Sequence, residues 1–163
     1  MTSIVADASP LIILFKSELE FILPILFDRI LVPGAVFDEI LAGSEGDRAK
    51  RLLPEISWIT KVQALPLESE LQFVLGRGEC EVLSTAKELE GTRVLLDDAA
   101  ARKAAKVFGI PFVGTGGVLV IAYRKGLIPS FDAALDAVTS SGLWISPEIE
   151  RLLRIEANRN RTN

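Results

Sequence analysis

Four short apolar segments, each followed by a segment with helical spacing, constrain the fold of this chain more than any other feature. They are "SIVAD" (3–7), "RILVP" (29–33), "RVLLDD" (93–98) and "IPFVGT" (110–115). Such apolar and β-branched runs are typical of buried strands. Strands that alternate with helices form parallel sheets with helices on both faces. We therefore predict an α/β fold, a three-layer α/β/α domain with a central parallel sheet of four to five strands.

The remaining segments fill in the domain. The segment "WITKVQAL" (58–65) alternates apolar and polar residues, as an edge strand or an extended connection does. Apolar residues recur at helical spacing elsewhere, and glycine marks several helix ends. We predict helices over 9–15, 19–26, 34–43, 48–53, 79–91, 99–109, 116–126 and 130–146. The length of 163 residues suits one domain over 1–155, followed by a polar tail over 156–163.

Composition excludes several classes of site. The chain has no histidine and one cysteine, Cys80, so an internal disulfide, a thiolate metal cluster and a histidine base are all excluded. A net charge of −4 excludes a strongly basic surface that would hold nucleic acid by bulk electrostatics. The N-terminal segment lacks the pattern of a signal peptide, and charges and Pro24 interrupt the apolar stretch after it. We expect a cytoplasmic protein without a membrane span.

Carboxylates stand at the ends of two predicted strands and in the first turn of one predicted helix. Asp7 ends the first strand, and Asp97 and Asp98 end the segment 93–98. Glu79 lies on the apolar side of the helix that follows Gly78, whereas Glu81 points almost opposite on a helical wheel. Ligands of open parallel sheets bind beyond the carboxyl ends of the strands. We therefore expect these acids to share one rim of the sheet.

Each acid taken singly also has a plain structural interpretation. An aspartate after a strand is more often a cap or turn residue than a catalyst, and Ser9 is more often an N-cap than a nucleophile. Glu79 could equally be a solvated residue at a helix end. Clustered like charges repel, however, unless a cation neutralises them. Because the chain lacks histidine, its ligands are hard oxygens, and we expect Mg²⁺ or Mn²⁺.

Four segments, taken in order, resemble the PIN-domain family of metal-dependent ribonucleases, especially the VapC-like toxins of prokaryotic toxin and antitoxin pairs. They are "IVADASPLI" (4–12), "LVPGAVFDEIL" (31–41), "GRGECEVLSTAKEL" (76–89) and "VLLDDAAARKAAKVFGIPFVGT" (94–115). No single motif is long, so the resemblance depends on their order. It covers nearly the whole chain.

The resemblance implies roles for individual residues. The family's aspartate at the end of the first strand, with a hydroxyl two residues later, matches Asp7 and Ser9. Its glutamate after a "VP" segment matches Glu39, which helical periodicity alone does not select. Its third acid matches Glu79, where glutamate replaces the commoner aspartate. The fourth acid fits Asp97 better than Asp98, although a shift of one residue would exchange them.

Two further positions follow from the resemblance. Glu81, in "GECEV", resembles an acid of the related flap-endonuclease fold and would contact the metal ligands rather than the metal itself. The hydroxyl that usually precedes the fourth acid is missing from "LLDD", and Thr115 could replace it, although a helix cap is the commoner role for such a threonine. The resemblance thus implies catalytic acids Asp7, Glu39, Glu79 and Asp97, candidate metal ligands Asp7, Glu79, Asp97 and Asp98, and supporting residues Ser9, Glu81 and Thr115.

The implied activity is cleavage of single-stranded RNA by a water activated by Mg²⁺ or Mn²⁺. Arg102, Lys103 and Lys106 lie on the helix after Asp97 and could hold the RNA backbone, although such charges more often form a solvated helix face. Aromatic residues are few, and none is nominated for base stacking. By analogy the partners are a second copy in a homodimer and a small antitoxin whose arginine or acidic tail occupies the acidic rim.

Two alternatives come from other functional classes. A non-catalytic PIN-like binding module would keep the fold and the acids but lack turnover. A phosphoacceptor receiver domain is also an α/β protein with clustered acids and Mg²⁺. Receiver domains carry their acidic pair after the first strand, whereas here the pair follows Leu96 and the first strand provides only Asp7. The receiver alternative is therefore the weaker one.

Overall fold

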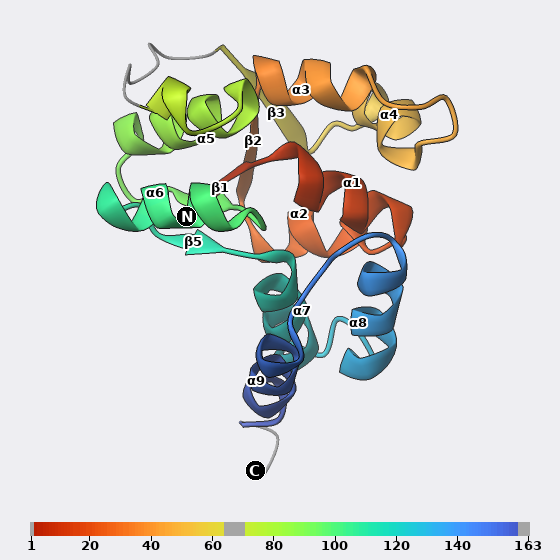
Figure 1. Cartoon of the computed structure of the whole chain (residues 1–163). Coiled ribbons are helices and arrows are strands. Elements are labelled where there is room, and N and C mark those ends of the chain that lie inside the picture. The colour runs from red at the N-terminus through yellow and green to blue at the C-terminus, as the bar shows by residue number, and fades with distance from the viewer. Residues whose placement is uncertain (1, 64–70, 160–163) are drawn as a thin grey trace.

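The computed structural model describes residues 2–63 and 71–159 and contains a five-stranded sheet surrounded by helices (Figure 1). The strands are β1 (Ser3–Ala6), β2 (Arg29–Pro33), β3 (Ile59–Val62), β4 (Arg93–Leu95) and β5 (Phe112–Val113). The helices are α1 (Ala8–Lys16), α2 (Leu23–Leu26), α3 (Gly34–Leu41), α4 (Arg48–Leu52), α5 (Arg77–Glu88), α6 (Ala99–Val107), α7 (Thr115–Arg124), α8 (Phe131–Ser140) and α9 (Pro147–Asn158). Short 3-10 turns lie at η1 (Glu20–Ile22), η2 (Leu53–Glu55) and η3 (Leu71–Phe73).

The sheet has the strand order β3-β2-β1-β4-β5, and every pair is parallel. The prediction of an α/β fold around a parallel sheet of four to five strands is confirmed. The order reverses between β1 and β4, which are neighbours in the sheet although α1 to α5 separate them along the chain. In open α/β sheets the carboxyl ends of the strands at such a reversal form a crevice that binds ligands. Any site in this fold is therefore expected beyond β1 and β4.

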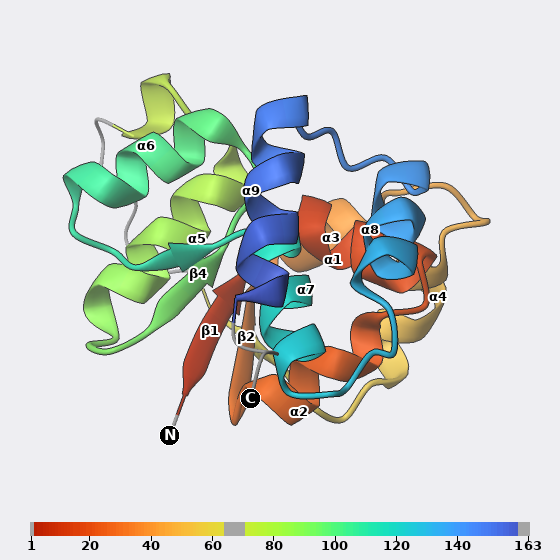
Figure 2. The same ribbon diagram turned by 90° about the horizontal axis from the view of Figure 1, so that it is seen from below.

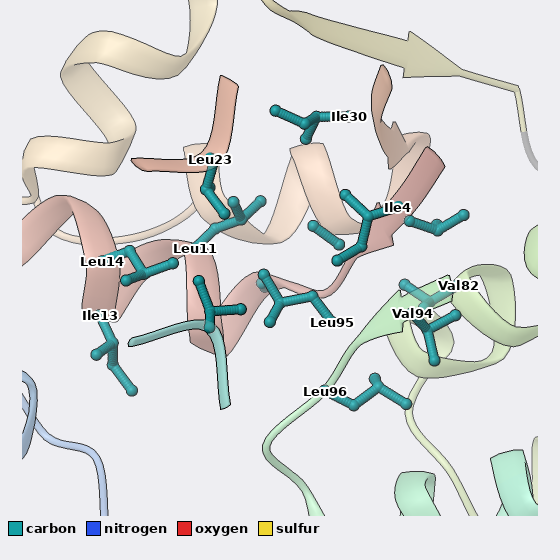
Figure 3. Close-up of a cluster of buried hydrophobic side chains, with 14 of the residues drawn as sticks. Ile4, Leu11, Ile13, Leu14, Leu23, Ile30, Val82, Val94, Leu95 and Leu96 are labelled. Atoms are coloured by element: carbon teal, nitrogen blue, oxygen red, sulfur yellow. The ribbon is translucent and has the colours of Figure 1, made fainter. Parts of the chain in front are cut away.

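The core explains why the strands have continuous apolar sequences. Successive residues of a strand point to opposite faces of the sheet, yet Ile4, Val5 and Ala6 of β1 are all fully buried. Both faces of the sheet are therefore covered, as in the three-layer arrangement predicted. Side chains from α1, β1, β2, β4 and α5 meet in this core (Figure 3).

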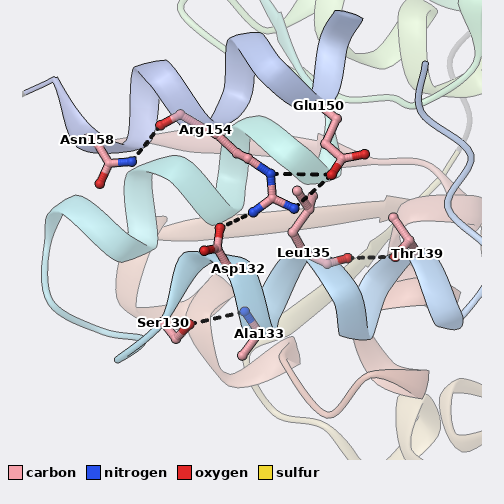
Figure 4. Close-up of polar contacts among 8 residues, drawn as sticks. All are labelled: Ser130, Asp132, Ala133, Leu135, Thr139, Glu150, Arg154 and Asn158. Carbon is pink, nitrogen blue, oxygen red and sulfur yellow. Dashed lines mark hydrogen bonds and ion pairs between the residues drawn. The ribbon is translucent and has the colours of Figure 1, made fainter. Parts of the chain in front are cut away.

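The C-terminal helices α7, α8 and α9 pack on one another and form one end of the molecule (Figures 1 and 2). Arg154 of α9 forms ion pairs with Glu150 on its own helix and with Asp132 on α8 (Figure 4). Gly116 provides a second contact, because a β-carbon there would lie 2.6 Å from a methyl carbon of Leu153. Helix α9 is thereby fixed close to the beginning of α7.

Several local predictions were wrong. Ser9 was predicted as an N-cap, but it lies within the first turn of α1, and Asp7 holds the N-cap position. One helix was predicted over 130–146, but α8 ends at Ser140, and a turn at Gly142, with φ of 115°, precedes α9. The second helix was missed, although Ser146 caps it and Pro147 begins it, both common at helix starts.

Two other predictions concern the C-terminal tail and the extended segment 58–65. Helix α9 continues to Asn158, and Ala157 is fully buried, so the first residues of the predicted polar tail are helical. The prediction of an extended segment over 58–65 is met by β3, while its last two positions lie outside the described residues. Within residues 2–63 and 71–159, no helix has both the length and the hydropathy required to cross a bilayer.

Candidate metal-binding active site

The candidate site lies where the sheet order reverses. Ala6 pairs with Leu95 in the register of β1 and β4, so the two strands end at the same edge of the sheet. Asp7 follows Ala6 directly, and its backbone N–H donates to the carbonyl of Leu95 at 3.1 Å. Asp97 follows two residues after Leu95. The topology therefore delivers two carboxylates to neighbouring strand ends, as the sequence analysis predicted.

Asp7 is buried, with 4% of its surface exposed. Burial raises the pKa of its carboxyl from 3.8 to about 7, against the opposing effect of a hydrogen bond from the backbone of Ala8. The negative charges of Glu79, Glu39 and Asp97 raise this pKa further, in that order of size. Three acids from three other segments therefore act electrostatically on the Asp7 carboxyl. In the absence of a cation, Asp7 resists ionisation near neutral pH.

Glu39 reaches the same region from α3. A β-carbon placed on Gly78 would lie 3.0 Å from Oε2 of Glu39 and 3.5 Å from Oδ1 of Asp7, so both oxygens border one small space. Glu39 is exposed as a whole residue, but partial burial of its carboxyl, and then the charge of Glu79, raise its pKa. Gly78 is itself buried at the start of α5. The absence of a side chain at this position leaves room between the two carboxylates.

Glu79 is half-buried in the first turn of α5. Its Oε2 lies only 2.5 Å from the position that a β-carbon of Gly76 would occupy, so the carboxylate folds back over the N-cap of its own helix. The positive end of the helix dipole stabilises a carboxylate in this position. Glu79 is thus placed beside the cluster, on a side chain with enough rotatable bonds to reorient.

Asp97 is held in place by donors from two other elements. The backbone N–H of Thr115 donates to Oδ1 of Asp97 at 2.8 Å, and the Thr115 hydroxyl donates to Oδ2 at 2.5 Å. Arg102 lies 3.4 Å from Oδ1 and also donates to the carbonyl of Leu96 at 2.9 Å. Thr115 is fully buried and is the first residue of α7, so it does not cap the helix; Gly114 is the N-cap. Its contacts instead fix the orientation of Asp97.

Asp98 has another role in the structure, and Ser9 lies at the surface. Asp98 is exposed, and its side chain caps α6 by accepting from the N–H of Ala101 at 2.8 Å. Ser9 is exposed on α1. Of the two adjacent aspartates, the structure therefore directs Asp97 toward the cluster and Asp98 toward a helix cap.

Glu81 corrects the helical-wheel interpretation of α5. The helical wheel predicted that Glu81 points away from the core. In the structure, however, only 2% of the Glu81 surface is exposed, and Glu79 is the less buried of the two residues. The physical reason is that α5 packs against α3 and against β1, β2 and β4, so it is buried on more than one side. Glu81 accepts from the N–H of Ala35 at 2.8 Å, at the first turn of α3, and lies 3.4 Å from Arg77. It ties α5 to α3, the helix that carries Glu39.

The basic residues predicted for RNA binding line a groove next to Asp97. Arg102, Lys103 and Lys106 form one side of this groove, which has a volume of about 690 Å³. Phe112 and Trp144 also line it. Trp144 is far from the basic helix along the chain, and no local sequence pattern connects the two, so no aromatic residue was predicted here.

The donor chemistry of the cluster fits a hard divalent cation. The side chains that face one another are carboxylates, with the Thr115 hydroxyl behind one of them, and Mg²⁺ and Mn²⁺ prefer such oxygen ligands. Among the described residues, no three acidic or cysteine side chains already converge on a single metal position. Two of the acids, Asp7 and Asp97, are fixed by their surroundings, whereas Glu39 and Glu79 have longer side chains that can adjust.

Comparison with known proteins agrees with this geometry. A search of curated proteins finds no match. A family model described as a PIN domain matches residues 3–158, which include every strand and helix listed above. The match covers nearly the full chain, and the PIN domain is a nuclease-type fold. By this match the chain belongs to the PIN-domain family.

Proposed function

We propose that this protein is a Mg²⁺- or Mn²⁺-dependent endoribonuclease that cleaves single-stranded RNA. The observation that carries the proposal is the buried carboxylate of Asp7, which faces three other acids and has a pKa of about 7. A fold gains no stability from such an arrangement. A divalent cation would make it favourable, because it would offset the repulsion among the four carboxylates.

Asp7, Glu79 and Asp97 would hold the ion, with Glu39 close enough to contribute. When bound, the ion supplies a Lewis acid that activates a water and stabilises the charge developing on a phosphodiester. Thr115 and Arg102 keep the Asp97 carboxylate in one orientation, since both of its oxygens accept from Thr115. The chain has no histidine, so carboxylates and water would accept and donate the protons that hydrolysis transfers.

The nuclease proposal is tested with purified protein and labelled single-stranded RNA. We expect cleavage with Mg²⁺ or Mn²⁺, none with EDTA, and loss of cleavage in Asp7→Asn and Asp97→Asn. Asp38→Asn is the matched control, because Asp38 is an exposed acid on α3 next to Glu39. A protein that binds RNA but never cleaves it, with any divalent ion, would support the non-catalytic alternative instead.

The sheet order argues against the receiver alternative. Receiver-type sheets have the order 2-1-3-4-5, in which the first and third strands are neighbours. Here β1 lies between β2 and β4. The match to a PIN domain points the same way.

The biological role that we propose is the toxin of a toxin and antitoxin pair, acting in the cytoplasm as a homodimer. This role is supported by the resemblance of the sequence motifs to VapC-like toxins. Expression of the protein alone should slow growth, and Asp7→Asn should abolish the effect. Sedimentation of the purified protein tests the dimer. A harmless wild-type protein with demonstrated nuclease activity in vitro would refute the toxin role and leave the nuclease proposal intact.

A further inference from the structure

We propose that the groove beside Asp97 binds a nucleotide of the single-stranded RNA substrate, with its base stacked on Trp144 and its phosphates held by Lys103 and Lys106. The inference rests on the proposed nuclease function, because it concerns how the substrate strand reaches the acids. It adds a stacking residue that the motifs of the chain do not indicate.

The two sides of the groove differ in chemistry. One side is α6, which contributes Arg102, Lys103 and Lys106, and Phe112 of β5 also lines the groove. The C-terminal part of the chain also lines the groove, through Ser146 and the apolar residues Leu143, Trp144, Ile145, Ile149 and Leu153. Gly116 and Gly117 at the beginning of α7, and Asp97, also line the groove. The volume of about 690 Å³ lies in the usual range for a small-molecule site.

Trp144 is 83% exposed, which is unusual for so large an apolar side chain. The other tryptophan, Trp58, is half-buried and stacks on Phe15 with 6.3 Å between ring centroids. Trp144 has an open ring face at the side of a groove. An aromatic face of this kind binds any nucleobase by stacking, because every base has a π-face.

The charges of the groove complement a polyanion. The whole chain has a net charge of −4, yet the lining of the groove contains three cations and only one acid, Asp97. Lys103 and Lys106 are exposed. The guanidinium of Arg102 and the ammonium of Lys106 lie 6.0 Å and 5.8 Å from the centre of the Phe112 ring, which steadies both over the groove.

A polynucleotide uses both sides of the groove at once. An apolar peptide or a second copy of the chain would cover Trp144 but leave the lysines without anionic partners. A strand of RNA places bases against the aromatic side and phosphates against the cationic side, which is the usual combination in single-strand binding sites. The groove also leads directly to Asp97, so the bound strand would enter the acidic cluster.

The test measures binding apart from cleavage. In the Trp58→Phe variant, Trp144 is the only tryptophan and reports on its own surroundings by fluorescence. Oligouridylate is added at low salt with EDTA, so that no hydrolysis occurs. We expect quenching of Trp144 fluorescence with saturation. In an otherwise wild-type protein, Trp144→Ala should weaken binding about 5- to 150-fold, while Trp144→Tyr should keep most of it.

The lysines are tested by the salt dependence of the same binding. For single strands, each lost phosphate contact should make the plot of log affinity against log salt shallower by about 0.7. The double variant Lys103→Gln with Lys106→Gln should therefore lower the slope by about 1.4. Lys125→Gln is the matched control, since Lys125 is an exposed cation after the far end of α7.

The outcomes separate this inference from the nuclease proposal. Equal binding by wild type and Trp144→Ala, or no change in Trp144 fluorescence on binding, would overturn the role of the groove even if cleavage is normal. A change in Trp144 fluorescence with protein concentration alone would overturn it in favour of self-association. Quenching with weaker binding in Trp144→Ala supports it, whether or not the protein cleaves with Mg²⁺.

Discussion

Replacing Asp7 with asparagine should stabilise the metal-free protein at neutral and alkaline pH. Asparagine has nearly the same shape, can still accept the hydrogen bond from the backbone of Ala8, and carries no charge. The change therefore removes the buried charge and its repulsion from Glu79, Glu39 and Asp97 without opening a cavity. Asp7, which we propose is required for activity, should therefore lower the stability of the metal-free protein.

The magnitude follows from the pKa of Asp7, which is raised from 3.8 to about 7. The folded protein holds the proton more tightly than the unfolded chain, so ionisation of Asp7 opposes folding. This loss is small below pH 4, grows as the unfolded chain ionises, and is complete above pH 7. Linkage gives a decrease of about 2.5 kcal/mol in the free energy of unfolding between pH 5 and pH 8, and about 4 kcal/mol in total.

The assay is urea unfolding in EDTA across this pH range for wild type and Asp7→Asn. The window is unusually clear, because the chain has no histidine to titrate within it. Glu39, whose pKa is also raised, adds a slope of the same sign. Wild type should lose stability as pH rises, and Asp7→Asn should lose much less. Asp38→Asn, an exposed acid on α3, should behave as wild type.

Two results would refute this reasoning. If wild type keeps the same stability from pH 5 to pH 8 in EDTA, the Asp7 carboxyl does not have a raised pKa. If Asp7→Asn is less stable than wild type at pH 8, the charge of Asp7 contributes favourable contacts that outweigh its burial. In either case the acidic cluster would no longer require a cation.

Three further predictions test the surroundings of the cluster. Adding Mg²⁺ or Mn²⁺ at pH 8 should raise the melting temperature of wild type but not of Asp7→Asn, because an ion that binds only the folded state stabilises it by mass action; equal shifts in both proteins would place the ion elsewhere. Gly78→Ala should change the free energy of unfolding by less than about 1 kcal/mol, since Glu39 is exposed and can move. It should nevertheless weaken the metal-induced shift in melting temperature, because the new β-carbon would lie 3.0 Å from Oε2 of Glu39. An unchanged metal response would refute the role of Gly78. Thr115→Val should destabilise the fold by about 1.5–3 kcal/mol in urea unfolding through loss of the hydroxyl bond to Asp97, whereas Thr115→Ser should not.

The fold could be predicted because its signals are local. The apolar runs at 3–7 and 29–33 were recognised as buried strands, and the parallel direction of the strands follows from the alternation of strands and helices. Helix α9 was missed because one helix was extended over 130–146, across the polar residues 139–142 where α8 ends and the chain turns at Gly142. The start of α9 at Ser146 was a local signal that could have separated the two helices.

The candidate site could be predicted only in part, because it depends on tertiary contacts. The positions of Asp7 and Asp97 follow from the rule that strand ends meet at one rim. The direction of Glu81 does not, since a helical wheel assumes one buried side and α5 has neighbours on several. The choice between Asp97 and Asp98 depended on the donors that each carboxylate finds. Asp98 accepts from the N–H of Ala101, three residues away, whereas Asp97 accepts from Thr115, which is distant along the chain.

Asp97 connects the two parts of the proposed mechanism. The N–H and the hydroxyl of Thr115 donate to its two oxygens, while Arg102, which lines the groove and lies over Phe112, contacts its Oδ1. A strand bound along α6 would bring phosphates toward Arg102, and each would compete with Asp97 for the guanidinium. Substrate binding would then loosen the ion pair of Asp97 and leave its carboxylate freer to bind a cation. Affinity for RNA and affinity for Mg²⁺ should therefore increase together, and by linkage each should raise the other by the same factor.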